Sequence, residues 1–214
     1  MPVLRRCPLF SEMADADILF AFADMQTVKR QFRNDQVIMA EGANADRFGI
    51  VLEGCAQTEQ FDVTGNKYII SDLRPGDIFA DSFAFSDAEE LSVEIRASGD
   101  CRVALIETAN FYTCALKRDN LRVVLKNALN AIANANLMLN RRMEILSKRR
   151  TRDKLLAFLT MQSRLKDSST VVVEYGRQEL ADYLCVDRSG LCVEIGKLCR
   201  EKIIKCSHNV FTLL

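Results

Sequence analysis

The stretch RQELADYLCVDRSGLCVEIGKLCREKII at residues 177–204 predicts two short helices joined by a tight corner. Each helix has one face to bury, because apolar residues recur three or four positions apart, at Leu180, Ala181, Leu184, Leu191, Ile195 and Leu198. Only residues 185–187 separate the two helices, and the Asp187 carboxylate is suited to cap the second one. We interpret the segment as a helix-turn-helix, whose second helix enters the DNA major groove by its N-terminal end. An ordinary pair of packed helices is the alternative.

The residues around this segment predict a small sheet and a further helix. A basic run at residues 148–152 (KRRTR) marks the expected hinge. After it, the spacing of Leu155, Leu156, Phe158 and Leu159 predicts a helix. The β-branched residues 170–174 (TVVVE) predict a short strand, and residues 207–214 are suited to pair with it. Such a sheet would make the unit a winged helix-turn-helix.

Residues 27–106 have the pattern of a small antiparallel barrel or roll. Short apolar runs recur there, at residues 37–39, 48–52, 68–70, 78–79 and 102–106. Turn residues separate the runs, at Glu41-Gly42, Glu53-Gly54, Thr64-Gly65-Asn66, Pro75-Gly76-Asp77 and Ser98-Gly99-Asp100. In front of them, residues 8–25 predict a helix with Ser11 as its N-cap.

Residues 109–147 predict a long helix with a narrow apolar seam. The seam residues alternate four and three positions apart, with Arg142 interrupting the series, and are Leu121, Leu125, Ala128, Ile132, Ala135, Leu139 and Leu146. Such a seam is typical of a helix that pairs with another helix, so we expect a homodimer interface. Packing of the helix against its own barrel is the alternative. The asparagines beside the seam are expected to face water or a ligand; they are Asn127, Asn130, Asn134, Asn136 and Asn140.

Charge is unevenly distributed along the chain, although the formal net charge is zero. Residues 1–140 carry 14 Lys/Arg and 20 Asp/Glu, a balance of −6, and residues 141–214 carry 15 and 9, a balance of +6. This asymmetry favours a regulatory module joined to a polyanion-binding module, and chance partition of surface charge is the alternative. Because no apolar run reaches about 18 residues and no signal-peptide core is present, we expect a cytoplasmic protein without a membrane partner.

The cysteines and the histidine do not form a pattern that predicts a metal site. Eight cysteines stand at positions 7, 55, 101, 114, 185, 192, 199 and 206, and none forms a C-x-x-C pair. The single histidine, His208, falls in the expected last strand, so we predict no haem and no cofactor. Most thiols are expected to be buried, with a redox-sensing thiol as the alternative. An enzyme is not expected, because no nucleophile–base pair or P-loop is present.

The order and the residues of these segments resemble the Crp/Fnr family of bacterial transcription regulators over essentially the whole chain. The specific segments are residues 49–54 (GIVLEG), 65–66 (GN), 75–79 (PGDIF) and 177–184 (RQELADYL). The resemblance implies an α+β fold with an N-terminal antiparallel β jelly roll like that of cyclic-nucleotide-binding domains, a long dimerisation helix and a C-terminal winged helix-turn-helix. The expected bounds are a sensor domain at residues 1–108, a dimerisation helix at 109–147 and a DNA-binding domain at 148–214.

The resemblance also implies the position of an effector pocket. Its expected residues are Gly76, Phe79, Ala80, Asp81, Ser82, Leu91, Ser92 and Asn136. In nucleotide-binding members a Gly, a Glu and an Arg-Ser pair hold the ligand. Here Ala80, Asp81 and Leu91 stand in the places of Gly, Glu and Arg, and Ser92 is retained. Because Leu91 removes the cation matched to the cyclic phosphate, we expect no useful binding of cyclic AMP or cyclic GMP. A small apolar or aromatic effector and a filled pocket without an effector are equal alternatives.

At the other end of the chain the resemblance implies a set of DNA contacts. Arg177 and Gln178 are expected at the phosphate backbone, and Arg188 and Ser189 at the bases. Lys197 and Arg200 are expected at phosphates further along, with solvated surface charges as the alternative. Val193 stands where many members carry an arginine, so the usual operator of the family is not transferred to this chain.

The expected function is a sequence-specific DNA-binding transcription regulator, a homodimer gated by an effector other than cyclic AMP. Its expected partners are double-stranded DNA, a second copy of the chain, a small-molecule effector of unknown identity and RNA polymerase. Two alternatives use the same scaffold. One is a thiol-redox-gated regulator, and the other is a ligand-binding or protein-interaction module without specific DNA recognition.

Overall fold

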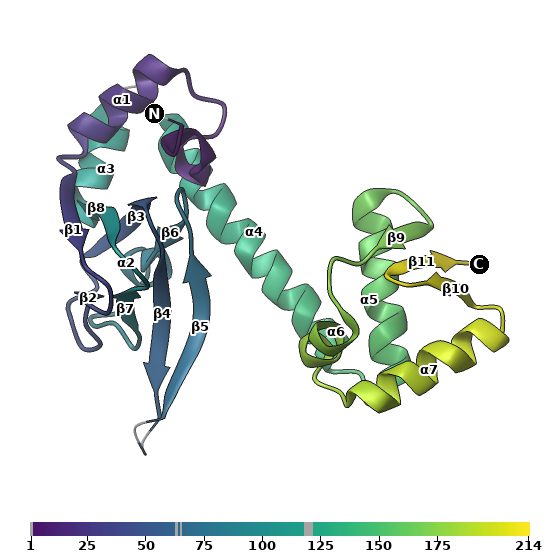
Figure 1. Cartoon of the computed structure of the whole chain (residues 1–214). Coiled ribbons are helices and arrows are strands. Elements are labelled where there is room, and N and C mark those ends of the chain that lie inside the picture. Colours follow the sequence, from purple (N-terminus) through teal and green to yellow (C-terminus); the bar gives the residue numbers. More distant parts are fainter. Residues whose placement is uncertain (1, 63, 65, 118–121) are drawn as a thin grey trace. The chain divides into compact units, whose positions relative to one another are not determined.

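The computed structural model describes residues 2–62, 64, 66–117 and 122–214, which form two compact units, Met1–Ala133 and Asn134–Leu214 (Figure 1). Gly65, in an expected turn and in one of the segments that resemble the Crp/Fnr family, and Leu121, the first residue of the predicted seam, lie outside the described residues. In the described ranges we find no helix with both the length and the apolar character needed to span a bilayer.

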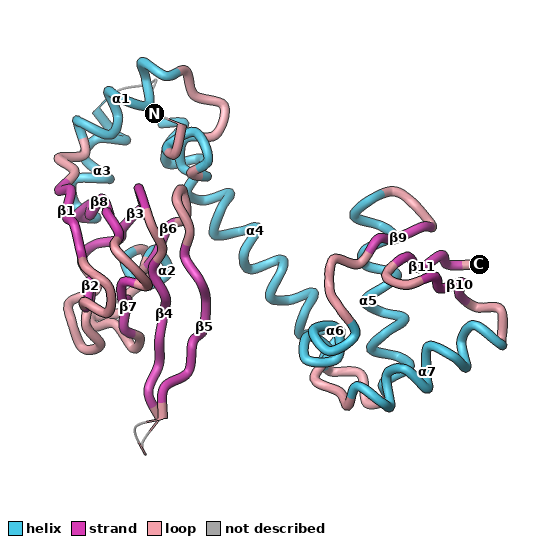
Figure 2. The backbone as a smooth tube through the Cα atoms, in the orientation of Figure 1, coloured by secondary structure: helices cyan, strands magenta, loops and turns pink. Residues whose placement is uncertain are grey.

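The N-terminal unit is built on two four-stranded antiparallel sheets (Figure 2). The strand orders are β1-β8-β3-β6 and β2-β7-β4-β5. The strands are β1 (Val28–Phe32), β2 (Val37–Met39), β3 (Arg47–Glu53), β4 (Ala56–Phe61), β5 (Lys67–Leu73), β6 (Ile78–Phe79), β7 (Glu94–Ala97) and β8 (Cys101–Glu107). The helices are η1 (Leu4–Arg6), η2 (Pro8–Phe10), α1 (Asp15–Asp24), α2 (Asp81–Ala84), α3 (Thr108–Lys117) and the first part of α4 (Arg122–Leu146). The predicted antiparallel jelly roll is confirmed.

The sheet that contains β3 is covered on both faces, which explains its nearly continuous apolar sequence. Phe48 and Ile50 pack with the helices in one buried cluster, whereas Val51 packs in a second cluster with residues of the opposite sheet such as Ile95. Alternate side chains of a strand point to opposite faces, so a strand that separates two clusters must be apolar throughout. The same holds for β8, whose Val103 and Ala104 belong to different clusters.

The predicted helix at residues 8–25 is wrong in its first half. Residues 8–10 form the 3₁₀ turn η2, which the Ser11 N–H closes by donating to the Pro8 carbonyl, and α1 begins at Asp15 with Ala14 as N-cap. Asp15 also accepts two hydrogen bonds of 2.7 Å from the Arg5 guanidinium. An acidic residue in the first turn is favourable at the N-terminus of a helix, so Asp15 stabilises a helix that begins later than the Ser11 N-cap predicted.

The first turns of α4 pack on the N-terminal unit itself. Val124 and Ala128 are buried in the cluster that contains Phe48. Asn127, which we expected beside water or a ligand, is buried, and its Nδ2 donates to the carbonyls of Leu9 (3.0 Å) and Ser11 (2.8 Å). In this part of the predicted seam the helix packs against its own domain, which was the alternative to a homodimer interface.

The C-terminal unit is a winged helix-turn-helix, as predicted. After the end of α4 it contains α5 (Thr151–Lys166), β9 (Thr170–Val172), α6 (Arg177–Leu184), α7 (Arg188–Arg200), β10 (Ile204–Ser207) and β11 (Val210–Leu213). The strands form a sheet of order β10-β11-β9, which stands beside the helices in Figure 2. All six apolar positions predicted from residues 177–204 are buried. His208 lies in the turn between β10 and β11 rather than in a strand, with φ of 48°.

Candidate nucleic-acid interface and effector pocket

The corner between α6 and α7 is held by local hydrogen bonds. Cys185 takes the left-handed conformation (φ 50°), and the Val186 N–H then bonds to the Ala181 carbonyl at 3.0 Å, which closes the end of α6. Asp187 caps α7 as predicted, because its Oδ2 accepts from the Gly190 N–H and the Ser189 hydroxyl, each at 2.6 Å. These hydrogen bonds lower the pKa of the Asp187 carboxyl, the Ser189 hydroxyl being the larger cause. The cap therefore persists at neutral pH.

The N-terminal half of α7 presents an exposed face. Arg188 stands at its first position, exposed and without a side-chain partner among the described residues. Ser189 is exposed but its hydroxyl is engaged by Asp187. Val193 is 55% exposed, and Lys197 donates to Glu194 at 2.6 Å. Of the residues predicted to contact DNA, Arg188 has the free functional group at the end of the helix that would enter a groove.

Arg177 and Gln178 are engaged within the chain. The Arg177 guanidinium donates to the His208 carbonyl and to the Cys206 Sγ (3.2 Å), and it lies 5.0 Å from the centre of the Phe211 ring. Its Nη1 is buried without a hydrogen-bond partner among the described residues. Gln178 is exposed, and its side-chain amide Nε2 donates to the Asp182 carboxylate at 2.8 Å. In this conformation Arg177 joins α6 to the wing.

Arg142 at the end of α4 contacts the helix-turn-helix, a contact that was not predicted from the sequence. Its guanidinium lies 5.1 Å from the centre of the Tyr183 ring on α6, and Tyr183 stacks on Tyr175 with ring centres 5.4 Å apart. A cation over an aromatic face is attracted by the ring quadrupole. Arg142, which interrupts the predicted seam, therefore couples the last turns of α4 to the first helix of the DNA-binding motif. The interruption itself was the only signal in the sequence.

Beyond its packed first turns, α4 exposes an apolar stripe. Leu139 is 64% exposed, and Leu129 and Met143 are similarly open. At about 100° of rotation per residue these residues belong to one stripe, about 100° wide, made of Leu125, Leu129, Ile132, Asn136, Leu139, Met143 and Leu146. We call this set the α4 stripe. Leu125 at its start also packs against the cluster of its own unit, and Ile132 and Leu146 are half-buried. The α4 stripe has Leu129 and Asn136 in place of Ala128 and Ala135 of the predicted seam and adds Met143, because Ala128 is turned toward the core of its own unit.

The residues expected to line the effector pocket belong to the N-terminal unit, apart from Asn136. Phe79, Ala80 and Leu91 are buried members of the apolar cluster between the two sheets, and Leu91 is only 2% exposed. The Phe79 ring fills the space above Gly49, where a Cβ atom would come within 2.0 Å of it. Any larger residue at position 49 would displace this ring. Apolar side chains thus occupy the position at which the resemblance implies a nucleotide phosphate.

The remaining residues expected in the pocket differ in exposure. Ser82 and Ser92 are exposed, Gly76 is buried with φ of 102°, and Ala80 takes the left-handed conformation with φ of 59°. Burial raises the pKa of Asp81, against the opposing effect of backbone N–H groups. The last expected residue, Asn136, lies in the C-terminal unit on the exposed part of α4, where its Oδ1 accepts from Asn140 at 2.7 Å.

The thiols differ widely in exposure. Cys7, Cys101 and Cys114 are buried, Cys199 and Cys206 are half-buried, and Cys55, Cys185 and Cys192 are exposed. Burial raises the pKa of the Cys7 thiol to about 12. Cys192 is the thiol on the exposed face of α7, next to Val193, a position that sequence reasoning did not single out. In the described part of the chain, no three Cys, His, Asp or Glu residues are grouped as a metal site.

We predict that iodoacetamide at pH 8 labels Cys55, Cys185 and Cys192 at least about tenfold faster than Cys7, because the reactive species is an accessible thiolate. A thiol with a pKa of about 12 has almost no thiolate at that pH. Peptide mapping by mass spectrometry during a time course measures the rates, with the unfolded chain in guanidinium as the control. Rapid labelling of Cys7 in the folded protein would show that this packing of the N-terminal segment is wrong.

Comparisons with known proteins give one family match, within the N-terminal unit, and structural matches that cover both units. The sequence matches the cyclic nucleotide-binding domain family over residues 29–118. The structure resembles the catabolite activator protein of Thermus thermophilus with a TM-score of 0.58 and 17% identity, over 97% of this chain and 93% of that one. The regulator CLP of Xanthomonas campestris gives 0.53 and 15%, over 93% and 99%. DNR of Pseudomonas aeruginosa gives 0.53 and 13%, over 100% and 92%.

The search of curated proteins gave no match to this sequence. The structural likenesses extend through both units, although the sequence identities are low. The resemblance predicted from the sequence is confirmed: the chain has, over nearly its whole length, the fold of the Crp/Fnr regulators, and its residues 29–118 match the cyclic nucleotide-binding domain family.

Proposed function

We propose that this chain is a sequence-specific DNA-binding transcription regulator that acts as a homodimer. The observation that carries the proposal is the free Arg188 guanidinium at the exposed N-terminal end of α7, in a helix-turn-helix with a wing. In this motif the second helix contacts base edges with its N-terminal residues. The likeness to a catabolite activator protein and to a c-di-GMP responsive global regulator supports the same proposal.

The α4 stripe supports the homodimer. An apolar repeat with four- and three-residue spacing is the pattern of paired helices, and a single polar residue within it, here Asn136, is a known means of fixing register. Two copies related by a two-fold axis would present two recognition helices to successive major grooves, about 34 Å apart. Within this proposal residues 1–108 act as sensor, 109–147 as dimerisation helix and 148–214 as DNA-binding domain.

Selection from a pool of random duplexes tests the proposal. We expect enrichment of a sequence with two half-sites whose centres are about 10 base pairs, one helical turn, apart or a multiple of that spacing. Affinity for the selected duplex should fall steeply with salt, as phosphate contacts require. A selection that enriches no sequence would instead favour a module that binds ligands or proteins and lacks specific DNA recognition.

We predict that cyclic AMP and cyclic GMP do not bind at micromolar concentrations. Leu91 stands in the place of the phosphate-binding arginine and is buried among apolar side chains, so a cyclic phosphate there would lack its matched cation. Isothermal titration measures the binding, with a nucleotide-binding member of the family as positive control. A dissociation constant in the micromolar range or below would contradict this part of the proposal, while leaving DNA binding untouched.

A thiol-gated regulator is the second candidate, favoured by one observation. Cys192 is exposed on the face of α7 that would meet DNA. Oxidation of this thiol by a peroxide would place a polar group on that face. Peroxide treatment that lowers affinity for the selected duplex in the native protein, but leaves a Cys192→Ser variant unchanged, would support this candidate over gating by a small molecule.

A further inference from the structure

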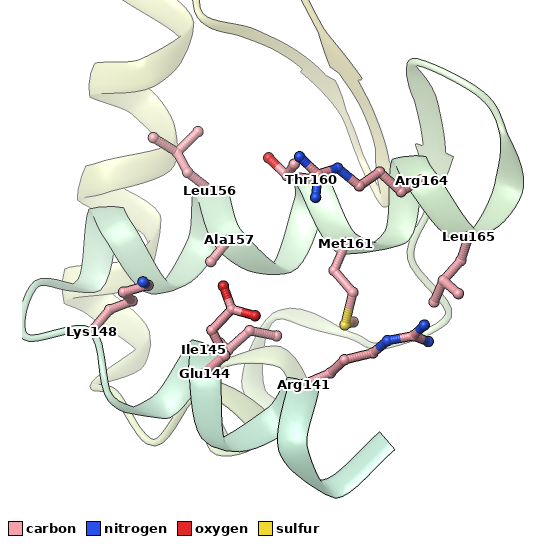
Figure 3. Close-up of a pocket in the computed structure, with 10 residues that line it drawn as sticks. All are labelled: Arg141, Glu144, Ile145, Lys148, Leu156, Ala157, Thr160, Met161, Arg164 and Leu165. Carbon is pink, nitrogen blue, oxygen red and sulfur yellow. The ribbon is translucent and has the colours of Figure 1, made fainter. Parts of the chain in front are cut away.

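The C-terminal unit contains an open pocket of about 500 Å³ between the last turns of α4 and α5 (Figure 3). Its lining residues are Arg141, Glu144, Ile145, Lys148, Leu156, Ala157, Thr160, Met161, Arg164 and Leu165. Ala157, Met161 and Leu165 point from α5 toward α4 in Figure 3, and Glu144 and Arg141 point from α4 toward α5. The volume is in the range of sites that take small organic molecules, about 300–1,000 Å³.

The charged residues of this pocket lack partners. Arg141, Lys148 and Arg164 form no salt bridge or side-chain hydrogen bond within the described ranges, and Glu144 is the acidic residue beside them. The lining thus carries three positive charges and one negative charge. Nearby cations are engaged, as Arg152 is with Glu201 at 2.9 Å and Lys154 with the Leu184 carbonyl at 3.1 Å. Other cations of the unit, such as Arg149 and Arg150, also have no side-chain partner in the described ranges, but they lie outside the lining of this pocket.

The pocket lies on the opposite side of α4 from the α4 stripe. At about 100° per residue, its α4 residues are centred about 160° from the stripe. A second copy that pairs along the stripe therefore leaves the pocket open. Its combination of apolar surface and unpaired cations matches a ligand with an apolar body and an anionic head group.

We propose that this pocket binds an amphipathic organic anion, such as a carboxylate with a medium-length hydrocarbon chain. Arg141 binds the head group, because a guanidinium donates two parallel hydrogen bonds to a carboxylate. Arg164, whose guanidinium lies beside Thr160 in Figure 3, adds positive charge to the lining. Met161, Leu165 and Ala157 contact the hydrocarbon body. Glu144 disfavours a second negative charge on the ligand. Since the site joins α4 to α5, such an anion is our candidate for the effector, and this last step rests on the proposed function.

Isothermal titration of the full-length protein with dodecanoate, below its micelle concentration, tests the site. We expect saturable binding of one dodecanoate per chain at micromolar concentration, with no binding of acetate, which lacks the body, or of dodecanol, which lacks the charge. The Arg141→Gln/Arg164→Gln variant should bind at least tenfold more weakly, and Ala157→Trp, which fills the pocket, should not bind. The Arg149→Gln/Arg150→Gln variant removes two cations outside the lining and should bind as the native protein does.

The site is disproved if dodecanoate shows no saturable binding, or if Arg141→Gln/Arg164→Gln binds as tightly as the native protein. Circular dichroism shows whether each variant is folded, and the double glutamine variant keeps the test valid if Ala157→Trp does not fold. A change of at least threefold in affinity for the selected duplex on addition of dodecanoate supports the effector role. Unchanged DNA affinity with intact dodecanoate binding disproves that role alone, whereas absence of specific DNA binding in every sample disproves the proposed function.

Discussion

Leu139→Asp is expected to convert the dimer into a monomer and to abolish binding to a duplex with two half-sites. Leu139 lies in the α4 stripe and is 64% exposed in the single chain. Burial of each leucine side chain contributes about 1.5–3 kcal/mol, and the two-fold axis places two of them in the interface. The aspartates would in addition leave two unpaired charges in an apolar seam. A loss of about 4 kcal/mol or more corresponds to a dimer about 1,000-fold weaker.

Leu137→Asp is the matched control for this experiment. Leu137 is 52% exposed on the same helix, and about 200° of rotation, two residues of an α-helix, separates it from Leu139. Sedimentation velocity over a range of concentrations measures the oligomeric state, and fluorescence anisotropy measures DNA affinity. If Leu139→Asp stays dimeric, or if Leu137→Asp disrupts the dimer equally, the α4 stripe is not the interface.

The sequence predicted those features that depend on neighbouring residues. The two helices of the DNA-binding motif follow from the spacing of residues such as Leu180 and Leu191, and the Asp187 cap needs only the N–H groups of the next turn. Short apolar runs and the turn residues between them likewise predicted a small antiparallel barrel or roll, which the structure shows as two packed sheets. In the helix-turn-helix the partners stand a few positions apart, so the pattern contains them both. Strands such as β1 and β8 pair across a long stretch of sequence, and that pairing does not follow from a local pattern.

The rotation of α4 could not be predicted in the same way. The apolar residues allow two stripes that differ by a small rotation, and the choice depends on Asn127 bonding to Leu9 and Ser11, more than 100 positions earlier. That contact turns Ala128 inward and leaves Leu129 exposed. The seam predicted from spacing alone therefore included Ala128, which faces the core of its own unit.

The directions of long polar side chains also could not be predicted from the sequence. Arg177 begins α6, where the family resemblance implies a phosphate contact, yet its guanidinium meets the His208 carbonyl and the Phe211 ring of the wing. The left-handed conformation of Cys185 and Ala80 was equally hidden, because glycine is the residue that usually marks such positions. Tertiary contacts decide both features, and they join residues that no local pattern relates.

Arg188→Ala is expected to weaken discrimination between the selected duplex and random DNA by about 1–3 kcal/mol, which is about 5- to 150-fold, with little change in non-specific binding. Arg188 is exposed at the first position of α7 and has no partner to lose within the described residues, so the substitution leaves the fold intact. An arginine in this position can donate two hydrogen bonds to the O6 and N7 atoms of guanine. Anisotropy titrations with both duplexes measure the two affinities.

Two further variants separate a base contact from a phosphate contact at Arg188. Arg188→Lys keeps the charge but loses the paired donors, so it should retain non-specific affinity and still lose discrimination. Lys197→Ala, whose lysine is bound to Glu194, should weaken both duplexes equally and reduce the salt slope by about 1 if Lys197 contacts a phosphate. If Arg188→Ala instead lowers both affinities equally while Arg188→Lys restores both, Arg188 binds the DNA backbone. Base recognition would then have to come from the neutral residues of α7, of which Val193, 55% exposed, can contact a thymine methyl group.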